Sequence, residues 1–191
     1  MEEYIPVNMI RNNLNNIPQF DVPPPFTIRT YQPGDNEAWI RIHIESDFYS
    51  TITPTLFHEQ FGHDEEILSA RQFYLCDGDG TAIGTASAWF TDYRGQPNGR
   101  VHWVAIVPSM QGKGLAKPLL TAVCNRLAEF GHERAFLDTA SVRGPAIQLY
   151  LKFGFVPDIR NETDVKTWHS LRDEMSPGPL DSLDLDTIYP I

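Results

Sequence analysis

VHWVAIVPSMQGKGLAKPLLTAVCNRLAEF, residues 101–130, predicts a buried strand, a glycine-containing loop and an amphipathic helix in succession. Residues 101–107 are mostly β-branched or apolar, and Pro108 then ends the strand because it has no N–H to donate to a ladder. The helix is expected to begin near Leu115, since apolar residues recur from there at helical spacing. Gly131 follows as a left-handed terminator.

The loop QGKGLA, residues 111–116, is the part of this stretch best suited to bind a ligand. Gly112 and Gly114 have no Cβ, so the backbone can turn tightly and bring its N–H groups close to a ligand. These groups lie at a helix N-terminus, where the helix dipole is positive, and such a site suits a pyrophosphate. Lys113 adds positive charge at the rim. The alternative is a strand-to-helix turn in which the glycines serve backbone geometry alone.

The glycine pattern differs from two better-known phosphate loops. No Gly-Lys-Ser/Thr follows at the spacing of a Walker loop. The third glycine and the acidic ribose ligand of a dinucleotide-binding fingerprint are also missing. The sequence therefore favours a phosphate site of another class.

Two ordered motifs resemble those of the GCN5-related N-acetyltransferase (GNAT) superfamily. The segment Q-x-x-G-x-A at residues 111–116, directly after an apolar strand, is similar to the acyl-CoA pyrophosphate loop of that superfamily. The segment A-x-x-L-Y-x-K-x-G-F at residues 146–155 resembles its next helix and the strand that follows. The resemblance covers about residues 27–171 and is strongest over residues 100–156. Arg143 departs from the pattern, since the superfamily often has an asparagine there that contacts the cofactor.

The resemblance implies an α/β fold: a GNAT-like central mixed, mostly antiparallel sheet with a splayed parallel pair of strands and helices on both faces. The acyl-CoA N-acyltransferase domain is expected over residues 26–171. An extended N-terminal arm over residues 1–25 precedes it, and a C-terminal tail over residues 172–191 follows. The chain order also predicts the parallel pair, because a strand, a helix and a strand in succession form a right-handed crossover.

The remaining elements follow from hydrophobic periodicity and turn residues. The turn DGDG at residues 77–80 predicts a hairpin. Gly84, within the second strand of that hairpin, indicates a bulge or a close approach of another backbone. Residues 92–99 are expected to form a polar turn. The other strands are expected over residues 26–31, 71–76, 81–90, 134–139 and 165–171, and the other helices over residues 37–47, 53–61 and 146–153.

The superfamily resemblance also implies a set of cofactor contacts. In its members two strands splay apart and pantetheine pairs with their backbone, because buried backbone groups need partners. The backbone of Ala105, Ile106 and Val107 would contact pantetheine, and Arg143 stands at the position of a further cofactor contact. The residues that would bind the pyrophosphate are Gln111, Gly112, Lys113, Gly114, Leu115 and Ala116.

Direct acyl transfer to an amine requires the amine to lose a proton and the leaving thiolate to gain one. Tyr150 lies where the superfamily places its thiol-protonating tyrosine, and a phenol with an ordinary pKa of about 10 is protonated at neutral pH. The alternative is a core tyrosine on an amphipathic helix. His102 is the candidate base, because an ordinary pKa of about 6.5 suits accepting a proton near pH 7. The alternatives are a hydrogen-bonded structural histidine, or an amine that arrives neutral and needs no strong base.

The net charge, the cysteine count and the hydrophobicity of the chain narrow the classes of partner and of site that we expect. The chain has 191 residues and a formal net charge of −10, which argues against a nucleic-acid partner and is compatible with a cationic amine substrate or simply with solubility. Cys76 and Cys124 are too few for a disulfide framework or a zinc site, so we expect reduced core thiols and no metal. No apolar run is long enough to span a membrane, and the N-terminus lacks the features of a signal peptide. We therefore expect a cytoplasmic protein with no membrane partner.

The sequence thus predicts an N-acetyltransferase that moves an acetyl group from acetyl-CoA directly to a primary amine of a small molecule or peptide. One alternative is a non-catalytic acyl-CoA-binding sensor. Another is a partner-binding protein whose loop stays empty. The sequence leaves open the acceptor, the length of the acyl chain and the choice between monomer and homodimer.

Overall fold

A computed structural model of the chain describes residues 3–93 and 95–188. These residues divide into two compact units. The central unit comprises residues 19–89 and 101–130, and the terminal unit comprises the rest of the described residues. The loop and the helix predicted from the opening stretch lie in the central unit.

The described residues form a seven-stranded sheet in the order β2-β3-β4-β5-β6-β1-β7. Strands β1, β2 and β3 pair antiparallel with their neighbours, whereas β5 pairs in parallel with β6 at Gly99–Ala135 and Arg100–Phe136. This arrangement confirms the predicted mixed, mostly antiparallel sheet with one parallel pair. Strands β4 and β5 contribute residues to both units. The strands are β1 (Pro6–Arg11), β2 (Thr27–Thr30), β3 (Gln72–Cys76), β4 (Ala82–Tyr93), β5 (Gln96–Ile106), β6 (Ala135–Ala140) and β7 (Val156–Pro157).

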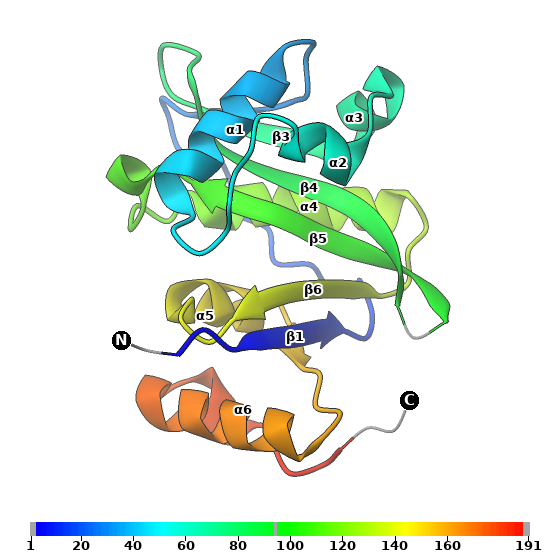
Figure 1. The fold of residues 1–191 in the computed structure, drawn as a ribbon, viewed down its shortest axis with the longest axis vertical. Helices are drawn as coiled ribbons and strands as arrows, with labels where there is room; N and C mark the ends of the chain where they lie inside the picture. Colours follow the sequence, from blue (N-terminus) through cyan, green and yellow to red (C-terminus); the bar gives the residue numbers. More distant parts are fainter. Residues whose placement is uncertain (1–2, 94, 189–191) are drawn as a thin grey trace. The chain divides into compact units, whose positions relative to one another are not determined.

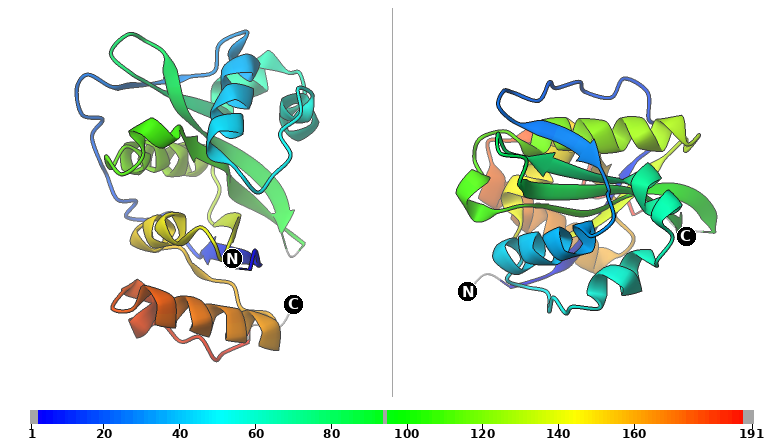
Figure 2. Two further views of the ribbon diagram at one scale, coloured as in Figure 1. Left: turned by 60° about the vertical axis from the view of Figure 1, so that its left-hand side comes forward. Right: turned by 90° about the horizontal axis from the view of Figure 1, so that it is seen from above.

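Helices cover both faces of the strands of the central unit. Figures 1 and 2 show α1 and α4 on opposite sides of β3, β4 and β5. Trp39 and Ile42 of α1 are fully buried, as are Leu119, Val123 and Leu127 of α4, and their helical spacing explains why α1 and α4 were predictable. Helix α3, which Asp64 caps by accepting two backbone N–H groups, was not predicted. The helices are α1 (Asp35–Ser46), α2 (Leu56–Phe61), α3 (Glu65–Arg71) and α4 (Ala116–Glu129).

The terminal unit contains α5 (Gly144–Lys152) and α6 (Glu162–Met175), and α6 corrects one prediction. The strand expected at residues 165–171 is wrong, because these residues form a helix. The side chain of Asn161 accepts the N–H groups of Thr163 and Asp164 and so caps the helix start. Trp168 and Leu171 are both buried at a spacing of three residues, which fits one helix face.

Residues 6–11, within the segment expected as an extended N-terminal arm, form strand β1. This strand pairs with β6 from Pro6–Ala140 to Arg11–Ala135, and Figure 1 shows the two side by side. Near the other end of the chain, the short 3-10 helix η2 (Pro179–Ser182) packs against α5 and α6, and Leu180 is buried. Segments far apart in the sequence therefore build the terminal unit together.

The hairpin between β3 and β4 forms as predicted. Asp77 and Thr81 pair across the turn, and the register of the two strands shifts between Leu75 and Cys76. A Cβ built on Gly84 would lie 2.9 Å from Ile106 Cγ1 and 3.0 Å from the Ala105 carbonyl oxygen. Both expectations for Gly84, a bulge and a close approach, are therefore confirmed, and the glycine lets the end of β5 lie against β4.

The turn predicted at residues 92–99 is shorter than expected. Strand β4 extends to Tyr93 and β5 begins at Gln96, while residue 94 lies outside the described part of the chain. The side chain of Asn98 donates to the carbonyl oxygens of Tyr93 and Gln96 and so holds this turn. Among the described residues, no helix combines the length and the hydrophobicity needed to cross a bilayer.

Candidate functional site

The segment that leaves β5 is held by hydrogen bonds at its base. The Val107 N–H donates to the Ile83 carbonyl oxygen of β4 (2.9 Å), and a short 3-10 turn, Pro108–Met110, follows. The Gln111 side chain folds back and donates to the Ile106 carbonyl oxygen (2.8 Å). Gln111, predicted as a pyrophosphate ligand, therefore also braces the loop against the end of the strand.

The two loop glycines have the backbone conformation that the loop requires. Gly112 and Gly114 have φ values of 74° and 78°, a left-handed region that disfavours any residue with a Cβ. No heavy atom lies within 4 Å of a Cβ built at either position, and both residues are exposed. The surface beside the loop is thus open to a ligand.

The N-terminus of α4 presents uncompensated positive charge. Within the described ranges, the backbone N–H groups of Gly112, Gly114, Leu115 and Ala116 donate no hydrogen bond to another backbone group. No side chain caps the helix, and its first turn contains no acidic residue. A helix start of this kind favours an anion.

Two side chains of this loop have separate roles: one anchors the loop to the core, and the other places a positive charge beside it. Leu115 is buried among the core residues of the central unit and so anchors the loop to the domain. Lys113 is exposed, and its ammonium lies 3.2 Å from the Met110 sulfur, at the side of the loop. The structure thus brings residues 111–116 together at the start of α4, as the sequence predicted.

His102 lies on β5 in an aromatic environment of the central unit. Its side chain is buried and packs edge-on against the Phe61 ring, with centroids 5.5 Å apart. Its Nε2 lies 3.1 Å from Gln60 Oε1 on α2. His102 is therefore hydrogen-bonded within the protein. A hydrogen-bonded structural histidine was one of the two roles that the sequence allowed for this residue.

Trp103, the next residue, has an unusual backbone conformation. Its φ of 49° is left-handed, which is rare for a bulky residue and interrupts the regular pleat of β5. The Trp103 indole packs edge-on against Trp39 and His43 of α1, with ring centroids 5.1 and 5.0 Å apart. Its N–H donates to Gln60 Oε1 (3.0 Å).

Sequence reasoning missed Gln60 and Trp103. Gln60 is a polar residue on a six-residue helix, and it meets β5 more than forty positions later in the chain. Nothing local in the sequence indicates such a contact. The one usable signal was that Trp103 adjoins the candidate His102.

Tyr150 and Arg143 belong to the terminal unit. Tyr150 is buried on α5, and its ring lies edge-on to the Phe155 ring with centroids 6.1 Å apart. Arg143 is the N-cap residue of α5, and its N–H donates to the Ala140 carbonyl oxygen (2.9 Å). Both residues therefore lie at defined positions of α5, at its buried face and at its start.

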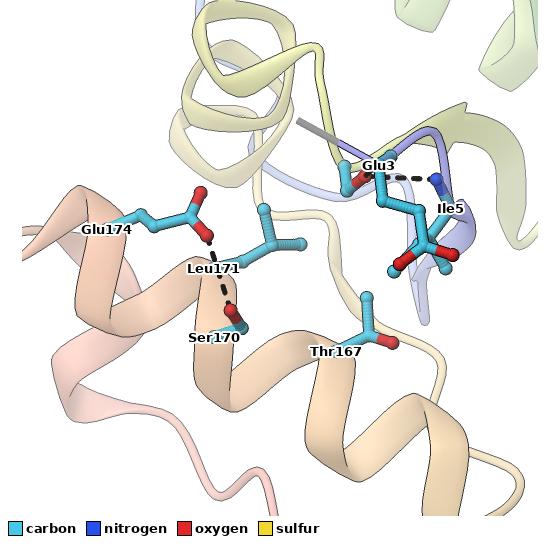
Figure 3. Close-up of a pocket in the computed structure, with 7 residues that line it drawn as sticks. Glu3, Ile5, Thr167, Ser170, Leu171 and Glu174 are labelled. Carbon is cyan, nitrogen blue, oxygen red and sulfur yellow. Dashed lines mark hydrogen bonds between the residues drawn. The ribbon is translucent and has the colours of Figure 1, made fainter. Parts of the chain in front are cut away.

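A pocket in the terminal unit contains none of the predicted site residues. Figure 3 shows it between the N-terminal segment and α6, with Glu3, Thr167 and Glu174 among its lining residues. Ser170 donates to Glu174 within it, and Thr167 donates to the Thr163 carbonyl oxygen. These hydroxyl groups are thus engaged with neighbouring protein groups. Within residues 3–93 and 95–188, no group of three or more His, Cys, Asp or Glu side chains is arranged to hold a metal ion.

Comparison with known proteins gives consistent matches over the same region. A family model described as the acetyltransferase (GNAT) family matches residues 36–155. A mycothiol acetyltransferase from Thermomonospora curvata is 30% identical over 142 residues, which cover 73% of this chain and 47% of that protein. The chain thus spans about half the length of the curated relatives that it matches.

Solved structures share the fold. A GCN5-related N-acetyltransferase from Sphaerobacter thermophilus matches with a TM-score of 0.63 and 22% identity, covering 81% of this chain and 50% of that one. A NatC complex bound to Gag peptide and CoA matches with a TM-score of 0.58 and 17% identity, covering 69% of this chain and 84% of that one.

Proposed function

Because the chain belongs to the acetyltransferase (GNAT) family, we propose that it moves an acetyl group from acetyl-CoA directly to a primary amine of a small molecule or peptide. One observation carries this proposal. The loop at residues 111–116 opens α4 with left-handed glycines, no side-chain cap and no acidic side chain in the first turn. Such an arrangement suits the pyrophosphate of acetyl-CoA.

The proposed donor site uses the end of β5 and the loop that follows it. The pyrophosphate binds the backbone of residues 111–116, with Lys113 adding charge at the rim. Pantetheine pairs with the backbone of Ala105 and Ile106, and Val107 contributes its carbonyl group, since its N–H is already donated to Ile83. Arg143 provides a further contact at the start of α5. The CoA bound to the similar NatC complex is consistent with this use of the fold.

The proposed chemistry needs three proton transfers, two from the nitrogen of the acceptor and one to the leaving sulfur. An ammonium has no lone pair, so His102 takes a proton from the acceptor before its nitrogen attacks the thioester carbon. The tetrahedral intermediate then collapses, the C–S bond breaks, and Tyr150 donates its phenolic proton to the leaving sulfur. As the amide forms, its nitrogen releases a second proton, which restores the Tyr150 phenol. The role of Tyr150 is proposed from the family motif, since Leu149-Tyr150 and Gly154-Phe155 match the family pattern. His102 is proposed as the base because it is the histidine of β5.

The acceptor is proposed to be a small cationic amine. The relatives named mycothiol acetyltransferase support a small-molecule acceptor, and the net charge of −10 favours a cation over an anion. A peptide amine remains the second acceptor class to be assayed.

A panel of amines and peptides, assayed for thiol release from acetyl-CoA, tests the proposed activity. We expect release with at least one amine, and a loss of about 100–10,000-fold in kcat for Tyr150→Phe with acetyl-CoA affinity retained, as for removal of a general acid. Binding of acetyl-CoA without release for any acceptor would instead identify a sensor. The absence of any binding heat would identify a protein whose loop stays empty.

A further inference from the structure

Two side-chain nitrogen atoms of β5 lie within hydrogen-bond distance of one oxygen atom of α2. Gln60 Oε1 lies 3.0 Å from Trp103 Nε1 and 3.1 Å from His102 Nε2. The left-handed φ of Trp103 interrupts the strand between these two side chains, so neighbouring residues that would normally alternate across the sheet both reach Gln60. The shared oxygen atom therefore restricts both the orientation of the Gln60 amide and the tautomer of the His102 ring.

The indole determines which way the Gln60 amide faces. An indole N–H is only a donor, so the Gln60 atom opposite Trp103 must be the carbonyl oxygen and not the NH₂ group. The same oxygen faces His102 Nε2 and can only accept a hydrogen there. His102 Nε2 therefore carries the hydrogen, and in the neutral ring the lone pair able to take a proton lies on Nδ1.

We propose that Gln60 is a positioning residue that fixes His102 in the Nε2–H tautomer, so that Nδ1 is the atom that takes the proton from the acceptor amine. This inference rests on the proposed function, in which His102 is the base. In that step an N–H bond of the ammonium breaks, its electron pair stays on the amine nitrogen, and an N–H bond forms at Nδ1. The resulting imidazolium keeps its Nε2–H bonded to Gln60 Oε1, which stabilises its charge.

The packing around the pair supports a fixed geometry. Phe61, one residue after Gln60, lies edge-on to the His102 ring, so α2 holds the imidazole both by a ring contact and by a hydrogen bond. Trp103 is in turn packed against Trp39 and His43 of α1. Two titratable rings lie against the Trp103 indole, those of His43 and of His102 itself, with centroids 5.0 and 6.0 Å away.

Proton-detected ¹⁵N correlation spectra of the full chain test the tautomer without reference to activity. The His102 signals are assigned by their loss in His102→Gln. We expect wild type to carry the hydrogen on Nε2. Gln60→Glu, which keeps an acceptor, retains that pattern, whereas Gln60→Met, of similar length without an acceptor, gives a mixture of tautomers. Gln19→Met, at an exposed amide paired with Asn125, is the matched control and leaves the pattern unchanged.

Kinetics then connect the tautomer to the reaction. We expect Gln60→Met to lower kcat/KM by about 10–100-fold, a part of what a general base contributes, and Gln60→Glu to recover most of that loss. Hydrogen on Nδ1 in wild type, or an unchanged tautomer in Gln60→Met, would overturn the role of Gln60. Full activity of His102→Gln would instead remove His102 from the proposed function, while the spectra would still decide whether Gln60 sets its tautomer.

Discussion

Tyr74 shows how burial of a single residue controls its ionisation. This fully buried phenol has one hydrogen, which the Asp35 carbonyl oxygen and Gln72 Oε1 share as acceptors, each 3.2 Å from the phenolic oxygen. Burial raises the pKa of Tyr74 well above its ordinary value, and the charges of Asp35 and Tyr31 raise the pKa further. The folded protein therefore keeps this phenol neutral at pH values at which an exposed tyrosine ionises.

We predict that this effect lowers stability in alkali. Unfolded tyrosine ionises near pH 10, so above that pH the unfolded state binds fewer protons than the folded state. The stabilisation is complete below about pH 10 and falls as the pH rises. Tyr74→Phe should lose about 1 kcal/mol at neutral pH, through its hydrogen bonds, and decline less steeply in alkali. Denaturant titrations across this range measure both effects, and an unchanged alkaline slope would contradict the assignment to Tyr74.

Cys76 and Cys124 are predicted to react slowly in the folded protein. Both thiols are buried, and burial raises the pKa of Cys76, an effect that Arg29 partly offsets. Because the thiolate is the reactive form, alkylation of native protein should be slow and should become complete on unfolding. Mass spectrometry after timed iodoacetamide exposure measures this. Rapid modification of the native protein by one reagent molecule per chain would show that a thiol is accessible.

Among the elements, the two ends of α4 allow the effect of backbone strain to be measured apart from the effect on ligand binding. Gly114 and Gly131 both have left-handed φ values, 78° and 77°, and both lie beside open space. Gly114 precedes α4 in the candidate site, whereas Gly131 follows the same helix at its other end. The two positions therefore form a matched pair.

We predict that Gly114→Ala and Gly131→Ala each destabilise the fold by about 1–2 kcal/mol, because a Cβ disfavours this conformation. Only Gly114→Ala should also weaken acetyl-CoA binding, by about tenfold or 1.4 kcal/mol, because its methyl group meets the approaching phosphate. Calorimetric titration beside thermal melts distinguishes the two effects. Equal affinities for the two variants would place the pyrophosphate elsewhere.

Helix α6 provides a prediction about capping. Asn161→Ala removes the acceptor for the first N–H groups of this helix and should cost about 1 kcal/mol of unfolding free energy, whereas Asn161→Asp should cost little. Asp64→Ala, which removes the corresponding cap of α3, is the matched comparison in the central unit. Chemical denaturation measures all three. An unchanged free energy of unfolding in Asn161→Ala would contradict the capping role of Asn161.

Local patterns determined which elements were predictable. The opening strand, loop and helix were predicted because the glycine requirement and the helical period lie within one short stretch of the chain. Residues 165–171 misled because Val165, Thr167 and His169 alternate as in a strand, while Trp168 and Leu171 fit a helix equally well. The cap at Asn161 was the signal that favours a helix.

For the molecule as a whole, contacts between residues far apart in the chain could not be predicted from the sequence. Strand β1 pairs with β6, more than one hundred residues later in the chain. No hydrophobic pattern within residues 6–11 indicates that partner. Gln60 likewise meets His102 only through the fold. The glycine loop before α4 was thus predictable from residues 111–116, whereas the contact between Gln60 and the candidate base His102 became visible only in three dimensions.

We propose that residues 111–116 bind the pyrophosphate of acetyl-CoA. The most direct test is a calorimetric titration of the full chain with acetyl-CoA and with S-acetylpantetheine, which carries the same thioester arm but no pyrophosphate. We predict that acetyl-CoA binds and that S-acetylpantetheine binds at least about tenfold more weakly, a difference of 1.4 kcal/mol or more. Equal affinity for the two thioesters, or no heat from acetyl-CoA, would contradict the claim.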